Sequence, residues 1–136
     1  MPTAAPTLTL LFDGLCPLCT REMRFMRRFD RHGRLVFLDI AAADFDPSRF
    51  GLTLPQTMAA MHGVLPDGTV IVGVEVFRRA YSAIGLGWLI GWTRWPIIRP
   101  IADCAYRAFA RVRPRFSKLE CDEGGRCGVR GGRQLR

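Results

Sequence analysis

The sequence contains no run approaching the ~20 apolar residues that a helix needs to cross a bilayer. Its start has no basic stretch leading into a long apolar segment, so we expect no signal peptide. Histidine is scarce, and His32 and His62 are isolated, with no second ligand at helical spacing. No Ser-His-Asp set, P-loop or dinucleotide fingerprint is present either. Because we expect neither a membrane-spanning helix nor a signal peptide, a cytoplasmic location is the default expectation.

The composition is that of an ordinary globular protein. Of the 136 residues, 49% are hydrophobic and 24% are charged, which most simply predicts one domain, residues 1–136, with a real core. The chain has five cysteines. In a reducing compartment they are better interpreted as redox or metal-binding groups than as a structural disulfide framework.

Basic residues outnumber acidic ones, and the excess is unevenly placed. The formal net charge is +8. Residues 107–136 hold nine basic and three acidic residues, and residues 21–34 hold six basic and two acidic ones. Long-range attraction therefore favours an acidic partner, bound through a basic helix face and the C-terminal tail.

The chemistry is concentrated in residues 8–19. An apolar run at 8–12 predicts a buried strand, and Cys16 and Cys19 then open a long helix with Pro17 in its first turn. The first sulfur lies against the unpaired N–H groups and the positive end of the helix, which favours its thiolate form. We therefore expect Cys16, where water reaches, to be the nucleophile. Cys19, one turn on and within disulfide range, turns toward the core as the resolving thiol. The alternatives are half of a zinc site or two structural thiols.

The same segment resembles a known motif. It is similar to the signature of the DCC family of thiol-disulfide oxidoreductases, named for its Asp, Cys and Cys: Asp13-Gly14-Leu15-Cys16-Pro17-Leu18-Cys19. The similarity continues to about Cys127. It implies a thioredoxin-like fold, a redox-active disulfide and a site that includes Asp13, Cys16 and Cys19. No bound organic cofactor is implied.

The spacing of apolar residues predicts the remaining elements. An amphipathic helix over 17–31 should place its arginines opposite the sheet, and a strand follows at 35–38. Strands within 58–65 and 69–72 flank a Pro-Asp-Gly turn, and Gly73 releases the chain into another helix. The order β-α-β then β-β-α is that of the minimal thioredoxin fold.

The fold class predicted for the chain is therefore α/β and thioredoxin-like. We expect the core at about 8–85, a C-terminal helical extension packed on it at about 86–113, and a flexible basic tail at about 114–136.

Two carboxylates near the dithiol have several possible roles. Asp13 can orient the loop, handle protons for Cys19, or simply cap the helix, as Asp does readily. Glu22 lies one turn past Cys19, among the apolar residues of the helix, and can accept the proton of the resolving thiol. We favour the commoner explanation for Glu22, a first-turn acid that reaches solvent.

Pro55 also has two interpretations. Thioredoxin-like proteins usually carry a cis-proline facing the dithiol just before the third strand, and Pro55 has a matching place in the chain. Thr53 and Gln56 instead fit a helix N-cap with a capping box. Both interpretations stay open.

The C-terminal cysteines can be redox, metal-binding or idle. Cys121 and Cys127 can form a second redox pair that exchanges with the first, or complete a four-cysteine zinc site with it. Five residues separate them, which is more than the two to four typical of zinc ligand pairs, so the spacing favours the redox role. Cys104 lies in an apolar helical pattern, and we expect it to be a small core residue.

A segment rich in tryptophan spans residues 86–101 and contains all three tryptophans of the chain. Arg94 and Pro96 interrupt it. Tryptophan and arginine together favour lipid headgroups, so the segment can be an interfacial anchor. Such aromatics more often close a core, and that is the role we expect.

The sequence thus predicts an enzyme that exchanges disulfides through a dithiol. Its substrates would be disulfide-containing proteins or small thiol compounds, and an unidentified reductant would recycle the pair. Two other classes stay open. One is a basic binding module for nucleic acid or an acidic protein. The other is a zinc-stabilised interaction domain built on Cys16, Cys19, Cys121 and Cys127.

Overall fold

The structure is a computed structural model that describes residues 5–112, 119–121, 127–129 and 134–135, with side chains over residues 5–112. Its centre is a four-stranded sheet of order β2-β1-β3-β4. β1 and β2 are parallel, whereas β3 runs antiparallel to both β1 and β4. The strands are β1 (Leu8–Phe12), β2 (Leu35–Asp39), β3 (His62–Val64) and β4 (Val70–Val72).

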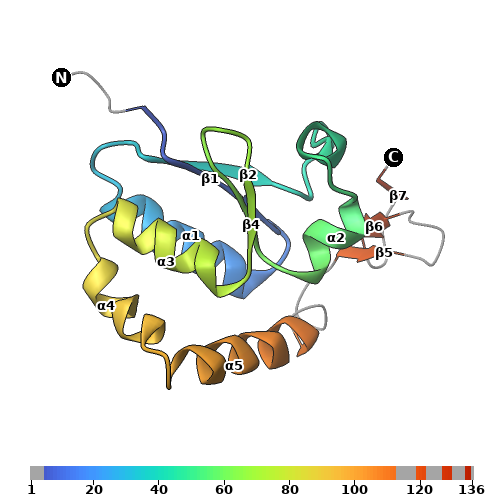
Figure 1. Ribbon diagram of the computed structural model, residues 1–136. Coiled ribbons are helices and arrows are strands. Elements are labelled where there is room, and N and C mark those ends of the chain that lie inside the picture. The colour runs from blue at the N-terminus through green and yellow to red at the C-terminus, as the bar shows by residue number, and fades with distance from the viewer. Residues whose placement is uncertain (1–4, 113–118, 122–126, 130–133, 136) are drawn as a thin grey trace.

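Helices cover the sheet and extend beyond it. Figure 1 shows α1 and α3 side by side on one face of the sheet, with α4 and α5 on the far side of these helices. The chain order is β-α-β then β-β-α, so the predicted thioredoxin-like α/β fold is confirmed. The helices are α1 (Pro17–Phe29), α2 (Leu54–Ala59), α3 (Val74–Ala83), α4 (Gly87–Gly91) and α5 (Arg99–Val112), with short 3₁₀ turns η1 (Pro47–Phe50) and η2 (Trp92–Arg94).

β1 is buried on both of its faces, as its continuous apolar run predicts. Leu10 packs with Met26 of α1 and Val76 of α3 on one face of the sheet. Leu11 packs on the other face with Ile40, where the segment after β2 folds back. Replacing a core side chain such as Met26 with alanine would destabilise the fold by about 2–5 kcal/mol.

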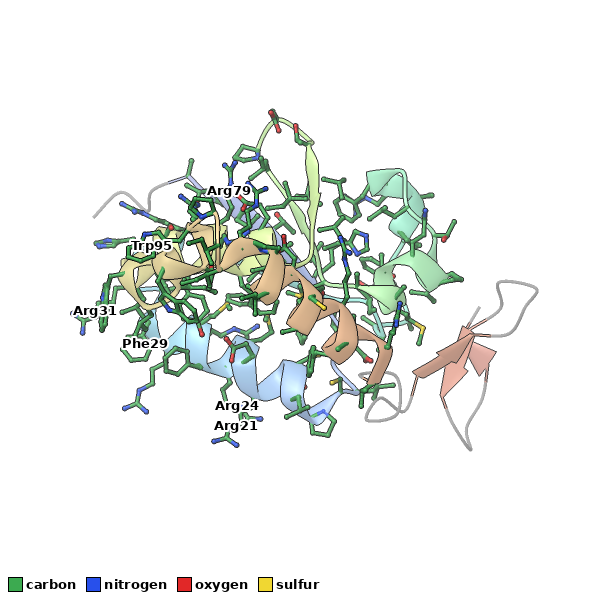
Figure 2. The ribbon with its side chains drawn as sticks, turned by 60° about the horizontal axis from the view of Figure 1, so that its bottom comes forward. Arg21, Arg24, Phe29, Arg31, Arg79 and Trp95 are labelled. Carbon is green, nitrogen blue, oxygen red and sulfur yellow. The ribbon has the colours of Figure 1, made fainter. Side chains whose placement is uncertain are left out.

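α1 begins where the sequence predicts and ends two residues early, at Phe29. The cause is Asp30, whose carboxylate accepts the backbone N–H groups of Arg34 (2.8 Å) and Leu35 (2.9 Å) and so fixes the entry into β2. The arginine face of α1 is exposed as predicted, and Figure 2 shows Arg21 and Arg24 pointing outward, with Arg31 just beyond the end of the helix. The exposed arginines of this face are Arg21, Arg24, Arg27, Arg28 and Arg31.

The strand predicted within 58–65 is shorter than expected, because α2 occupies its first part. Thr53 caps α2: its hydroxyl accepts the N–H of Gln56 at 3.3 Å, and the Gln56 side chain accepts the N–H of Thr53 at 2.8 Å. Pro55 lies in the first turn, where it loses no hydrogen bond. The peptide bond before Pro55 is trans, so the cis-proline interpretation is wrong.

The tryptophan-rich segment does not close a core, contrary to our expectation. Trp88, Trp92 and Trp95 are 74%, 56% and 66% exposed. The inward-facing residue here is instead Thr93, which hydrogen-bonds to a buried arginine of α3. Cys104 of α5 is exposed too, so its predicted core position is also wrong. None of the helices among the described residues is long and apolar enough to cross a membrane.

Part of the tail that we expected to be flexible is strand. A second antiparallel sheet is formed by three short strands, in which β6 pairs with both β5 and β7. The strands are β5 (Leu119–Cys121), β6 (Cys127–Val129) and β7 (Gln134–Leu135). The register of β5 and β6 places the Cα of Cys121 directly opposite that of Cys127.

Candidate active site

The two cysteines of the motif lie at the junction between β1 and α1. Cys16 is the N-cap of α1, with extended backbone angles (φ −88°, ψ 116°). Its Sγ accepts a hydrogen bond from the backbone N–H of Cys19, with 3.4 Å between nitrogen and sulfur. One of the otherwise unpaired N–H groups of the first turn thus points at the sulfur, where it stabilises negative charge.

Cys16 is less accessible than the sequence suggests, whereas Cys19 faces inward as predicted. Cys16 has no exposed surface and Cys19 is 9% exposed, so the expectation that water reaches Cys16 is wrong. The N-cap geometry explains the difference. A side chain that accepts an N–H from the first turn must fold back over that turn, and this turns the sulfur away from solvent.

Asp13 shapes the loop between β1 and α1. Its side chain is 1% exposed and accepts the backbone N–H of Leu15 at 2.9 Å. Its carbonyl oxygen accepts the N–H of Cys16 at 3.1 Å. These bonds position the N-cap residue, which is the loop-orienting arrangement that we considered from the sequence.

A second aspartate, which sequence reasoning missed, holds the same loop. Asp39 ends β2 and lies beside Phe12 in the parallel register. One of its oxygens accepts the N–H groups of Gly14 and Ala41, each at 2.8 Å. A Cβ atom on Gly14 would collide with the Asp39 carboxylate, so the loop needs glycine there. The available signal was the parallel pairing itself, which brings the ends of β1 and β2 together.

A cavity of about 610 Å³ opens beside Cys19. It lies between α1, α3 and α5, and its walls are mostly apolar. Leu18 and Phe25 belong to the apolar face of α1 but are 43% and 40% exposed, because they line this hollow. Phe77 of α3 and Phe109 of α5 line its other sides. The dithiol therefore borders a hydrophobic cavity through its second cysteine.

Glu22 lines the same cavity, and it is not the first-turn acid that we favoured. It lies in the second turn of α1, half-buried, and its carboxylate accepts a 2.5 Å hydrogen bond from the hydroxyl of Tyr81 on α3. Burial, and then the hydrogen bond to Glu22, raise the pKa of Tyr81 above its ordinary value. Tyr81 therefore stays protonated and keeps donating to Glu22. Nothing in the local sequence pattern indicates this contact between two helices.

Comparison with known proteins identifies the family. Residues 10–119 match the DCC1-like thiol-disulfide oxidoreductases. The chain belongs to this family. It is also 40% identical over 108 residues to an uncharacterized chloroplastic protein of Arabidopsis thaliana. That match covers 78% of this chain and 50% of the relative, so the chain spans about half the length of the curated relative. No solved structure matches the chain.

Membership of the DCC1-like family confirms the resemblance found in the motif and supports a thiol-disulfide redox function in general. The family match ends at residue 119, earlier than the similarity to about Cys127 that we expected. Cys121 and Cys127 therefore lie beyond it, and their side chains are outside the described residues. Among the described side chains, no group of three or more His, Cys, Asp or Glu residues could hold a metal ion.

Proposed function

We propose that this DCC1-like protein exchanges disulfides through the dithiol Cys16-Pro17-Leu18-Cys19. The observation that carries the proposal is the hydrogen bond from the N–H of Cys19 to Sγ of Cys16 at the start of α1. This donor stabilises a thiolate on Cys16, and the thiolate is the form that attacks a disulfide. Cys19 lies on the next turn of the helix, within reach of the same sulfur.

The reaction has two exchange steps. The Cys16 thiolate attacks one sulfur of a substrate disulfide, forms a mixed disulfide and releases the other sulfur as a thiolate. Cys19, once deprotonated, then attacks Sγ of Cys16 and releases the second substrate sulfur. Two electrons have passed to the substrate, and the protein is left with a Cys16–Cys19 disulfide. A thiol or dithiol reductant recycles it by the reverse exchange.

Substrate reaches the dithiol from the apolar cavity. Cys19 lines that cavity whereas Cys16 is fully buried, so the first attack requires local opening at the start of α1. The mostly apolar walls favour disulfides flanked by apolar groups, either in proteins or in small thiol compounds. Arg21 lies on the rim and leads to the basic face of α1, which favours acidic surroundings in the partner.

Glu22 accepts the proton of Cys19 during the second step. It lines the cavity that Cys19 borders, one helical turn away. Tyr81 is a positioning residue, because its hydroxyl holds the Glu22 carboxylate in one orientation. Asp13 has a less direct role, because it fixes the loop that presents Cys16. Pro55 loses its proposed supporting role, since the trans peptide bond removes the reason for it.

Cys121 and Cys127 form a second redox pair: their thiols reduce the Cys16–Cys19 disulfide and become a disulfide themselves, which the external thiol reductant then reduces. Their direct opposition in the β5–β6 register favours a disulfide between them, because side chains directly across an antiparallel pair have Cβ atoms about 4.5–5.5 Å apart. A reducing compartment such as the cytoplasm suits a protein whose cysteines must cycle between thiol and disulfide.

The test is to separate the two cysteines by substitution. Cys16→Ser should abolish reduction of a small disulfide substrate, whereas Cys19→Ser should accumulate mixed disulfides through Cys16 that mass spectrometry can map. Cys104→Ser is the matched control, because Cys104 is exposed on α5 and should leave the rate unchanged. A mixed disulfide trapped on Cys19 in the Cys16→Ser variant, with none on Cys16 in the Cys19→Ser variant, would reverse the assigned roles.

A further inference from the structure

The second functional surface of the molecule is the segment around the three tryptophans. Trp88, Trp92 and Trp95 are exposed at a spacing of four and three residues, and Ile97 and Ile101 continue the surface with 79% and 64% exposure. We call these five side chains the tryptophan surface. Several large apolar side chains exposed within one short segment indicate a site of interaction with another protein or a membrane.

The surface is fixed in place by a buried arginine. Arg78 of α3 is 3% exposed, and its guanidinium donates to both Oγ1 and the carbonyl oxygen of Thr93, each at 2.9 Å. The same guanidinium lies 3.5 Å from Glu75 and 3.8 Å from Asp103 of α5. Thr93 is thereby held inward while its neighbours on either side, Trp92 and Arg94, face out. The exposure of the indoles is thus a consequence of a specific buried network.

Within the tryptophan segment itself the charge has one sign. Residues 76–102 contain no aspartate or glutamate, and both Arg94 and Arg99 are exposed. The nearest acids on either side, Glu75 and Asp103, are those that pair with Arg78.

The basic face of α1 borders the same surface. A hollow of about 360 Å³ is lined by Phe25 and the half-buried Glu22 of α1 together with Leu89 and Trp92, so α1 and the tryptophan segment are neighbours. Figure 2 shows Arg31 and Trp95 at the same end of the molecule. Arg31, just beyond the end of α1, therefore adds positive charge at the end of the molecule where Trp95 lies.

We propose that the tryptophan surface binds the headgroup region of an anionic membrane. Indole rings combine a large apolar body with a polar N–H and favour the membrane–water interface. Arginines beside them add attraction to anionic lipids. Exposed aromatic residues and arginines, with Glu22 of the adjoining hollow half-buried and hydrogen-bonded to Tyr81, complement an extended negative surface with an apolar layer beneath it. The dithiol protein would then act on its substrates at a membrane surface without spanning the membrane.

Vesicle binding tests the proposal, because all three tryptophans lie in the segment and selectively excited tryptophan fluorescence reports on it alone. With vesicles of equal parts phosphatidylglycerol and phosphatidylcholine, the whole chain should sediment and its emission should shift to the blue. Pure phosphatidylcholine vesicles should bind much less. Trp88→Gln with Trp95→Gln should remove most of the binding while Trp92 stays as the probe. Val72→Gln, on the edge strand β4, is the matched apolar control and should bind normally.

The contribution of positive charge is tested with Arg94→Gln and Arg99→Gln. Each substitution should weaken binding to anionic vesicles by about fivefold. Arg49→Gln, an exposed arginine of η1, is the control and should have a smaller effect. Binding that is unchanged in the double tryptophan variant would overturn the proposal, because attraction would then be electrostatic only. Absence of vesicle binding, or a self-association that the same variant abolishes, would equally overturn it in favour of a protein contact.

Discussion

The backbone N–H of Cys19 points at Sγ of Cys16, with 3.4 Å between the two atoms. This one contact stabilises negative charge on the sulfur and also turns the sulfur inward, where it has no exposed surface. The N-cap geometry thus gives Sγ of Cys16 a hydrogen-bond donor and restricts access to it. We infer that local opening at the start of α1 gates the reaction.

Thiol labelling should reveal this restriction. In a Cys121→Ser, Cys127→Ser background, an alkylating reagent should modify the exposed Cys104 first. Cys16 should react at least about tenfold more slowly, the factor imposed by ~1.4 kcal/mol of opening free energy. Peptide mapping of the labelled protein over time measures both rates. Labelling of Cys16 as fast as that of Cys104 would show that the sulfur is open in solution.

The contact between Gly14 and Asp39 should couple in a double-mutant cycle. Gly14→Ala forces a Cβ against the Asp39 carboxylate, and Asp39→Ala removes the acceptor of two backbone N–H groups. Each should lower the free energy of unfolding by about 1–3 kcal/mol. The double variant should cost less than the sum, because the clash disappears with the carboxylate. Urea unfolding of the wild type, the two single variants and the double variant measures the four free energies of unfolding.

The control for this cycle is Gly91→Ala in α4. No atom lies within 4 Å of a Cβ placed there, and alanine is the better helix former. It should therefore leave stability unchanged or raise it slightly. Additive costs for the Gly14 and Asp39 variants would mean that the two residues do not constrain each other.

The central part of the fold could be predicted from sequence because its signals are local. The apolar run of β1 and the Cys16-Pro17 start of α1 need no distant partner to be recognised. The strand expected within 58–65 is shorter than predicted for a local reason as well, since the capping box of Thr53 and Gln56 starts a helix that takes up its first residues.

The site was less predictable, because its remaining features depend on tertiary contacts. Asp39 reaches the loop only through the parallel register, and Tyr81 reaches Glu22 only because α1 and α3 are neighbours. The exposure of the tryptophans depends on Arg78, a charged residue that composition assigns to the surface and the structure buries.

Tyr81 gives a pH-dependent prediction. Its pKa is raised in the folded state, so the stability it contributes is fully present below the pKa of an unfolded tyrosine, about 10, and is lost as pH rises through the higher folded value. The difference in tyrosinate absorbance between the wild type and Tyr81→Phe should therefore appear above pH about 10. Glu22→Gln should lower the midpoint only in part, because burial is the larger cause. A midpoint at the ordinary value would contradict the buried contact.

The same pair should affect the resolving step. Glu22→Gln should slow the release of substrate from the mixed disulfide and leave its formation unchanged, because only the second step needs the proton of Cys19 removed. Tyr81→Phe should slow it less, as expected of a positioning residue. Rapid-quench mapping of the mixed disulfide separates the two steps, and equal effects on both would assign Glu22 a structural role.

The tail cysteines distinguish a redox relay from a zinc site. Four thiolates around zinc would hold the metal near full occupancy, so we expect less than about 0.2 zinc per purified chain. Cys121→Ser should leave single-turnover reduction intact and alter recycling. If the purified protein held stoichiometric zinc and lost it on replacing either Cys16 or Cys121, the protein would be a zinc-stabilised domain and not a disulfide-exchanging enzyme.

A glutathione redox titration, with mass-spectrometric mapping of cysteine pairs at each potential, tests directly whether Cys16 and Cys19 are the redox centre. We expect Cys16 to pair with Cys19 in a single two-electron transition, and Cys104→Ser to leave this transition unchanged. If Cys16 and Cys19 stayed reduced across the whole range, or if each paired only with other cysteines, the dithiol would not be the redox centre of this protein.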